Sequence, residues 1–147
     1  REATLSNFNS IIDLLRNDPL GQSREKTSND AGIKYLEAFK AIQSDNNAKI
    51  IVGSYEETPI AVAQINFIQN LTYQGGMRAQ IEGVRVHQDY QSQGIGKLLF
   101  QHLTSLAKNR NCHIVQLTTD KSRPQAFKFY QELGFVNSHQ GFKLHLK

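Results

Sequence analysis

The spacing of hydrophobic residues changes along the chain, and each spacing predicts a different element. Near the N-terminus, Phe8, Ile11 and Leu15 recur at intervals of three and four residues, which is the period of an amphipathic helix. From about residue 48 the apolar residues form short runs typical of strands, and helical spacing returns later. The pattern predicts helices at 5–16, 31–43, 94–109 and 123–132, strands at 48–55, 59–69, 79–87 and 113–119, and two short closing strands at 135–136 and 142–146. Helices and strands mixed in this order indicate an α/β domain.

Breaker residues support several of these boundaries. Residues 17–30 are polar and contain a proline and a glycine, so we expect a loop between the first two helices. Pro124 falls in the first turn of a predicted helix, where a missing N–H costs nothing, and Gly134 is placed to end that helix.

The predicted strand at 79–87 contains a glycine, Gly83. A glycine inside a strand often marks a bulge, so we expect one there. The two-residue period of a strand puts the side chain of Glu82 on one face together with those of Val84 and Val86.

Length and composition fit one globular domain. The chain has 147 residues, of which 39% are hydrophobic and 20% charged, and this is enough for one core. Its apolar runs are only a few residues long, whereas a membrane-spanning helix needs about 20, so we expect no membrane partner. The single cysteine, Cys112, cannot form an internal disulfide, which favours a reducing compartment and a cytoplasmic protein.

The charge is mildly basic, with a net charge of +4 and a pI of about 9.3. The basic residues are scattered, with no run of three, so a plain basic surface or a small ligand with several phosphates fits better than nucleic acid. The five histidines lack the H-x-x-x-H and H-E-x-x-H spacings, and we expect no metal site.

The most informative segment is residues 91–97, Gln-Ser-Gln-Gly-Ile-Gly-Lys, between a predicted strand and a predicted helix. Its glycines allow a tight turn, and a helix start offers amides and a positive dipole end, which together bind phosphate. A P-loop requires glycine at position 91 and Ser or Thr after Lys97, but Gln91 and Leu98 stand there. A dinucleotide fingerprint requires a third glycine where Leu99 stands. A plain strand–helix turn is the alternative that these residues alone leave open.

The same segment fits Gln-x-x-Gly-x-Gly, which resembles the acyl-CoA-binding signature of the GNAT superfamily of N-acetyltransferases. Residues 81–90, IEGVRVHQDY, look like the family's fourth strand and its lead-in, although Gln88 stands where proline is common. Residues 126–135, AFKFYQELGF, match the family's A-x-x-[FL]-Y-x-x-x-G-F element. These segments follow one another in the same order as in the family. The resemblance is to small single-domain members of bacterial type, and it covers nearly the whole chain.

The resemblance implies one domain over residues 1–147 with a three-layer α/β fold. Its central twisted sheet is mixed and mostly antiparallel, with about six to seven strands flanked by about four helices. Residues 1–4 look like the tail of the family's first strand, which we therefore expect to be truncated. In the family, the fourth strand splays from the fifth and opens a slot for the pantetheine arm of the cofactor.

The resemblance also implies acetyl-CoA as co-substrate. The amides of residues 91–97 would bind its pyrophosphate with help from Lys97, and the backbone of Val84 and Val86 would pair with the pantetheine arm like an added strand. Arg123 stands where many relatives carry a CoA-contacting asparagine, so a ligand role and a surface role both stay open. The implied CoA-binding residues are Val84, Arg85, Val86, Gln91, Ser92, Gln93, Gly94, Ile95, Gly96, Lys97, Arg123 and Phe127.

Two residues are candidates for proton transfer. Tyr130 matches the family's tyrosine, which would protonate the departing CoA thiolate as general acid. Glu82 resembles an acidic position that would accept the proton of the acceptor amine, directly or through water. A pairing of Glu82 with Arg78 or Arg85 is an equally weighted structural alternative.

The resemblance predicts an N-acetyltransferase that transfers acetyl from acetyl-CoA to a primary amine by direct attack in a ternary complex. A non-catalytic acyl-CoA-binding or sensing module is the alternative. The acceptor would be an amine-bearing small molecule or peptide, read by residues 17–30 and about 137–142. Members of this family often form homodimers through sheet edges or C-terminal strands, so a homodimer is one option.

Overall fold

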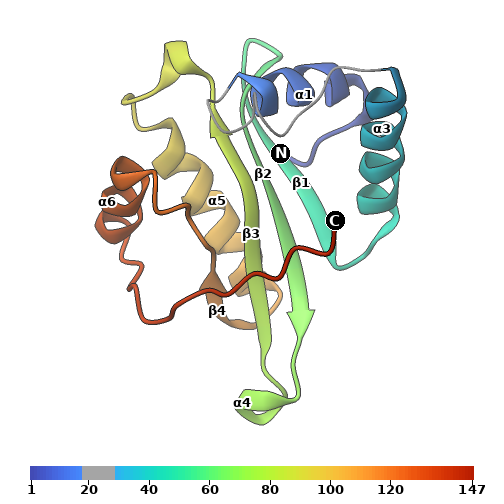
Figure 1. Cartoon of the computed structure of the whole chain (residues 1–147). Helices are drawn as coiled ribbons and strands as arrows, with labels where there is room; N and C mark the ends of the chain where they lie inside the picture. Colours follow the sequence, from blue (N-terminus) through green and yellow to red (C-terminus); the bar gives the residue numbers. More distant parts are fainter. Residues whose placement is uncertain (18–28) are drawn as a thin grey trace. The chain divides into compact units, whose positions relative to one another are not determined.

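The computed structural model describes residues 1–17 and 29–147, which form two compact units, Arg1–Gln116 and Leu117–Lys147 (Figure 1). The first unit contains η1 (Leu5–Asn7), α1 (Phe8–Arg16), α3 (Asn29–Ser44), β1 (Ala48–Tyr55), β2 (Thr58–Gln69), α4 (Thr72–Gly75), β3 (Met77–Val86), η2 (Gln88–Tyr90), α5 (Ile95–Asn109) and β4 (Cys112–Gln116). The second unit contains α6 (Pro124–Glu132). The predicted loop at 17–30, with its expected role in acceptor choice, lies almost entirely outside the described residues.

Four strands form one sheet in the order β1-β2-β3-β4. The first two pairs are antiparallel and the pair of β3 and β4 is parallel. The predicted α/β class with a mixed, mostly antiparallel sheet is therefore confirmed, although the sheet has fewer strands than expected within the described part of the chain.

The outer edge of β1 is covered by the N-terminal residues 1–3. The amide of Ala3 donates to the carbonyl of Ile50, and the amide of Val52 donates to the carbonyl of Arg1, both over 2.8 Å. The segment thus continues the sheet by a short antiparallel bridge.

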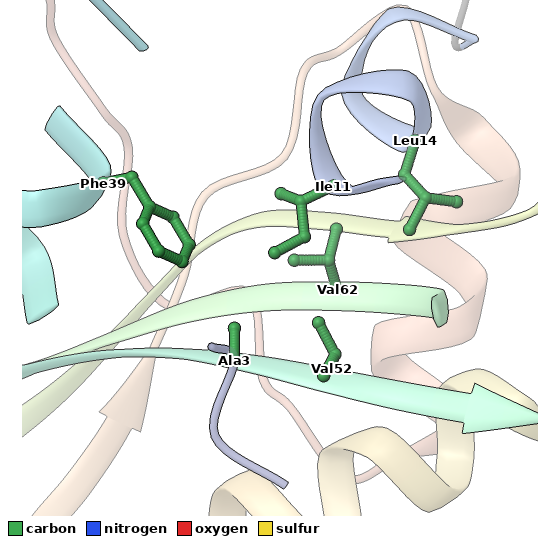
Figure 2. Packing of buried hydrophobic residues seen from close by; sticks show 6 residues of the cluster. All are labelled: Ala3, Ile11, Leu14, Phe39, Val52 and Val62. Carbon is green, nitrogen blue, oxygen red and sulfur yellow. The ribbon is translucent and has the colours of Figure 1, made fainter. Parts of the chain in front are cut away.

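Helices α1 and α3 pack on one face of the sheet. Side chains of both helices and of the N-terminal segment meet valines of β1 and β2 in a buried cluster (Figure 2). The aromatic rings of Phe8 and Phe39 join the two helices edge to face, with centroids 5.6 Å apart. The labelled members of this cluster are Ala3, Ile11, Leu14, Phe39, Val52 and Val62.

Helix α5 covers the opposite face, where it contacts β1 to β4 (Figure 1). Its buried side chains are Leu99, Phe100, Leu103 and Ala107. These residues recur at helical intervals, which confirms the amphipathic helix predicted over 94–109. Leu98 of the same helix is 62% exposed, because the buried face is centred on Leu99 and Leu103.

Strand β3 carries a bulge. Val62 of β2 lies opposite Arg85, and Gln64 lies opposite Glu82, so two residues of β3 oppose the single β2 residue between them. Gly83 is one of the two, with a φ of +62°, in the left-handed region that favours glycine. The bulge predicted from this glycine is therefore confirmed.

The bulge changes which side chains share a face of the sheet. Directly opposed residues of neighbouring strands point to the same side. Glu82 and Arg85 therefore share a face, because their partners in β2 are two residues apart, whereas Val86 opposes Ala61 and points to the other face. The prediction that Glu82 and Val86 share a face is wrong, because the inserted residue shifts the two-residue period by one.

The second unit contains one helix and an extended segment. Helix α6 begins at Pro124 and is followed by Gly134, whose φ is +96°, so both boundary residues act as predicted. The two closing strands predicted at 135–136 and 142–146 are not formed, since the structure has no strand after β4 in its described residues. The local pattern favours strands there, but a strand also needs a neighbouring strand to bond with.

Candidate active site

Residues 91–97 form a turn that leads into α5. Gly94 is the residue before the helix and has a φ of +83°, and Ser92 also lies in the left-handed region, with a φ of +61°. A non-glycine residue there costs about 1–2 kcal/mol, so the fold holds this turn against local strain. The first helical bond runs from the amide of Leu98 to the carbonyl of Gly94 over 3.1 Å. The amides of the first three residues of α5 therefore have no acceptor within the helix and can bind an anion.

Two glutamine side chains hold this turn to the residues before it. The Gln91 amide nitrogen donates to the carbonyl of Val86 over 3.1 Å, and the Gln93 amide nitrogen donates to the carbonyl of Asp89 over 3.0 Å. The signature glutamine thus connects the turn to the end of β3. Its side chain contributes to the site by fixing the backbone, a role that the sequence pattern does not specify.

Strand β3 extends beyond its parallel neighbour. Strand β4 ends at Gln116, which lies opposite Gln80, whereas β3 continues to Val86. The amide of His87 donates to the carbonyl of Ile60 in β2 over 2.7 Å, so the alternation of a strand turns the N–H and C=O of Val86 to the opposite edge. The last residues of β3 therefore have one edge on β2 and one beyond the end of β4.

Side chains already bind two carbonyls near this edge. The carbonyl of Val86 accepts from Gln91, and the carbonyl of Val84 accepts from the guanidinium of Arg85 over 2.8 Å. An extended ligand along this edge could still accept from the amide of Val86. Residues 84–86 were all predicted to contact CoA. The Arg85 side chain instead bonds to the backbone of its own strand, at the carbonyl of Val84.

A row of polar side chains crosses β2 and β3 on the face that also carries α1 and α3. Gln64 lies opposite Glu82, and Asn66 lies opposite Gln80. The Gln80 amide nitrogen donates to the Glu82 carboxylate over 3.2 Å, and the Gln64 amide nitrogen donates to the Asn66 side-chain oxygen over 2.8 Å. Glu82 itself is solvent-exposed. The face therefore offers a carboxylate surrounded by amide groups, which suits an amine or another polar ligand.

The row continues to β4 and ends at an arginine. Gln116 donates to the side-chain oxygen of Gln80 over 2.7 Å, and Arg78 donates to that of Gln116 over 3.4 Å. The Arg78 guanidinium also lies 5.3 Å from the ring centre of Tyr73. Arg78 thus contacts Gln116 and Tyr73, not the carboxylate with which it could have paired. Gln64, Asn66, Gln80 and Gln116 are not among the residues predicted for the site, although polar residues two apart on neighbouring strands are a usable signal in the sequence.

A cavity of about 360 Å³ lies at the end of the sheet where β3 leads into the turn. Aromatic rings form part of its wall: the centroid of Tyr90 lies 6.1 Å from that of Tyr55 and 5.9 Å from that of His87. The sequence did not predict this cavity, because the hairpin and η2 that line it are distant in the chain. The lining residues are Tyr55, Glu56, Thr58, Pro59, Ile60, His87, Asp89 and Tyr90.

The remaining predicted residues lie in the second unit. The ring of Tyr130 is half-buried and packs against Phe129 and Phe135, with centroids 5.3 and 5.9 Å away. Phe127 is 39% exposed, and Arg123 precedes the first turn of α6. The three residues thus belong to one short helical element, while all other predicted site residues belong to the first unit.

The chemistry of the remaining polar groups is limited. Burial raises the pKa of the Cys112 thiol, and the Arg110 guanidinium lowers it in part, so the thiolate is disfavoured overall. The described residues contain no group of three or more His, Cys, Asp or Glu side chains arranged to hold a metal ion. None of the described helices is both long enough and apolar enough to cross a membrane.

A comparison with protein-family models matches residues 9–135 to the Acetyltransferase (GNAT) family. The chain belongs to the GNAT acetyltransferase family. The match includes the turn at 91–97 and all of α6, so the family resemblance seen in the sequence is confirmed. Family members use acetyl-CoA as acyl donor, and the turn of this GNAT protein has the free amides that such a donor's pyrophosphate requires.

The chain is similar to one protein of known structure and to one curated protein. A crystal structure described as a transcriptional regulator from Bacillus halodurans C-125 is 44% identical and has a TM-score of 0.95, covering 99% of this chain and 97% of that one. An uncharacterized N-acetyltransferase, ycf52, of Gracilaria tenuistipitata var. liui is 34% identical over 65 residues, which are 44% of this chain. The aligned part spans only 34% of that curated relative's length.

A more distant neighbour shares the fold. The structure of AAC(6')-Iy, in complex with the bisubstrate analog CoA-S-monomethyl-acetylneamine, has a TM-score of 0.81 at 15% identity and covers 100% of this chain and 96% of that one. At this identity the likeness supports the α/β fold and nothing finer.

Proposed function

We propose that this GNAT protein is an N-acetyltransferase that transfers acetyl from acetyl-CoA to a primary amine in a ternary complex. The observation that carries the proposal is the course of β3. This strand runs past the end of β4 and leads directly to the turn at 91–97 and the amides of α5. An open strand edge that leads to an anion-binding helix end suits a ligand with an extended amide arm and a pyrophosphate.

The donor contacts follow from this arrangement. The amides at the start of α5 bind the pyrophosphate, and the exposed Lys97 adds a positive charge. The pantetheine arm follows the free edge of residues 84–86, where the amide of Val86 is a donor. Ser92, Gly94 and Gly96 allow close approach, while Gln91 and Gln93 fix the turn. Arg123 and Phe127 are proposed as further contacts from α6.

The reaction is a direct acyl transfer. The amine nitrogen attacks the thioester carbonyl, a C–N bond forms and the C–S bond breaks. Glu82 accepts the proton that the amine loses, directly or through water, and Tyr130 gives its hydroxyl proton to the departing CoA thiolate. Proximity of the two bound substrates supplies much of the acceleration.

The acceptor binds over the polar row that contains Glu82. Gln80 donates to this carboxylate and leaves its second oxygen for the amine. The neighbouring amides of Gln64 and Asn66 suit a polar acceptor, such as a small molecule or a peptide. We propose a cytoplasmic location on the basis of the single cysteine.

The deciding experiment is acetyl-CoA binding by calorimetry, together with thiol release over a panel of primary amines. We expect binding and turnover with at least one amine. Tyr130→Phe should lower the chemical rate by about tenfold or more with little change in acetyl-CoA affinity, because only proton transfer is lost. Binding without turnover over a broad panel would favour the sensing module, and no binding would refute the donor site.

A second candidate function comes from the Bacillus halodurans relative, which is described as a transcriptional regulator. If this GNAT protein also acts on DNA, the complex should weaken steeply as salt rises. A mobility-shift titration at two salt concentrations separates this function from the enzyme. Our expectation is no specific DNA binding, because the basic residues are scattered.

A further inference from the structure

The cavity of about 360 Å³ at the end of the sheet has no role in the proposed acetyl transfer. One wall comes from the end of β1, the start of β2 and the turn between them, and the other comes from η2 and the residue before it. All of its lining residues belong to the first unit. Small-molecule pockets have volumes of about 300–1,000 Å³, so a cavity of this size suits a small ligand.

Three aromatic rings line this cavity. The ring of Tyr90 makes an angle of 47° with the ring of Tyr55 and an angle of 76° with the ring of His87. Neither pair is stacked face to face, so ring faces remain available to a ligand. The face of a tyrosine ring carries negative charge density and attracts a cation within about 6 Å of the ring centre, most strongly when the cation is weakly hydrated. The two tyrosines therefore favour a cation whose charge is covered by alkyl groups.

The charged groups of the cavity wall are acidic. Glu56 and Asp89 line the cavity, and no lysine or arginine stands among its described lining residues. The ring of His87 accepts the amide proton of Asp89 at Nδ1 over 3.1 Å, so this nitrogen carries no proton and the ring is neutral in this arrangement. Two carboxylates without an opposing cation give the cavity a negative potential, which attracts a positively charged ligand.

Backbone bonds hold the two walls of the cavity together. Tyr55 pairs with Thr58 across the two-residue turn between β1 and β2. The amide of His87 donates to the carbonyl of Ile60 over 2.7 Å, which connects the second wall to the start of β2. Within that wall the amide of Tyr90 donates to the carbonyl of His87 over 2.9 Å. The rings and carboxylates are thus carried on a backbone that is already in place before a ligand binds.

We propose that this cavity binds a small organic cation with an alkylated ammonium group, such as trimethylammonium. The tyrosine faces contact the alkyl groups, and Glu56 and Asp89 balance the charge. A lipid headgroup also offers trimethylammonium, but it adds a phosphate that would lie near the same two carboxylates. A free small cation therefore fits both the charge and the volume of the cavity better.

The test compares choline with the neutral alcohol in which a tert-butyl group replaces trimethylammonium. Both are titrated into the unchanged protein by calorimetry, with sodium chloride keeping the ionic strength constant. We expect choline to bind about tenfold or more tightly than the alcohol, because the two differ in charge and not in shape. Saturable choline binding that the alcohol matches would show a merely apolar pocket and would overturn the proposal. Absence of saturable choline binding would overturn it as well.

Phosphocholine distinguishes the two sources of the cation. Its phosphate places a negative charge near Glu56 and Asp89, so it should bind more weakly than choline under the same conditions. Tighter binding of phosphocholine than of choline would assign the cavity to a phosphate-bearing headgroup and would overturn the free cation as its ligand.

Variants of Tyr55 test whether choline binds in this cavity. Tyr55→Leu removes a ring face but keeps an apolar side chain, and it should weaken choline binding about fivefold or more. Tyr55→Phe is the matched control, because it keeps the ring and should change the affinity by less than about twofold. Tyr55 is 56% exposed, so we expect both variants to fold, and urea denaturation checks this. Unchanged affinity in Tyr55→Leu, or an equal loss in both variants, would overturn the proposed contact.

The contribution of charge is measured in the same way. Glu56→Gln should weaken choline binding about threefold and leave binding of the neutral alcohol unchanged, because only the attraction between charges is lost. Glu37→Gln, at another exposed glutamate, controls for the change in net charge. An equal effect of the two variants would contradict a local role of Glu56. None of these titrations contains acetyl-CoA or an acceptor amine, so their failure leaves the proposed acetyl transfer untouched.

Discussion

The two halves of β3 have different neighbours. Residues 77–81 pair with β2 on one side, and all but the last of them also pair with β4 on the other side. Residues 82–86 pair with β2 alone. The first half buries Ala79 and Ile81 and has a regular register with β2. The second half contains the bulge, none of its residues is buried, and it leads to the turn at 91–97.

The difference shows how one strand serves both stability and binding. Neighbours on both sides use the backbone groups of the first half, so no backbone edge is left there for a ligand. Where β4 ends, amides of β3 face an open edge, and the bulge gives the side chains a new register. We expect substitutions in the first half to change stability and those in the second half to change activity.

The largest expected effect is on stability in the first half. Ile81 is only 2% exposed, so Ile81→Ala should lower the free energy of unfolding by about 2–5 kcal/mol in urea denaturation. The half-buried Val84 is the control, and Val84→Ala should cost about 1 kcal/mol, because part of its side chain is already in water. An equal loss at both sites would contradict the division of β3 into two halves.

The next effect is on the reaction in the second half. Glu82→Gln should lower the rate about 100-fold, because the acceptor amine loses its general base. The free energy of unfolding should change by about 0.5 kcal/mol or less, since Glu82 is exposed. Glu37→Gln, at another exposed glutamate, controls for the lost charge. If the rate of the Glu82 variant is unchanged, another group or bulk water accepts the proton.

A smaller effect is expected at the boundary between the halves. Gly83→Ala should destabilise the protein by about 1–2 kcal/mol, because alanine is strained at a φ of +62°. No atom lies within 4 Å of the position that a Cβ would take, so backbone strain is the only expected cause. Gly83→Asn is the control, and it should lose less because asparagine tolerates this region better. Equal losses for the two variants in thermal denaturation would argue against strain.

The smallest effect is expected where the second half meets the turn. Gln91→Ala removes the bond to the carbonyl of Val86 and should weaken acetyl-CoA binding about three- to tenfold in calorimetry. Gln93→Ala removes a similar bond to Asp89, which lies outside β3, and should have the smaller effect. The reverse order would mean that the turn and not the end of β3 limits donor binding.

The site itself was only partly predictable. The spacing of glycines and the neighbouring strand and helix identified residues 91–97, because phosphate-binding turns depend on local backbone freedom. The connection of Gln91 to Val86 and the polar row around Glu82 were not predictable in the same way. Hydrogen bonds between side chains of different strands depend on register, which a bulge alters.

The sequence by itself determined four of the helices and the four strands of the sheet, because periodicity, Pro124 and Gly134 act locally. It placed the end of the last of these strands at 119, whereas β4 ends at Gln116. It also marked the bulge at Gly83, since a left-handed residue favours glycine. The tertiary structure decided which side chains of β3 share a face of the sheet with Glu82. It also decided whether residues 142–146 form a strand. Both depend on pairing with distant residues, and a strand pattern remains an unpaired segment until another strand satisfies its backbone.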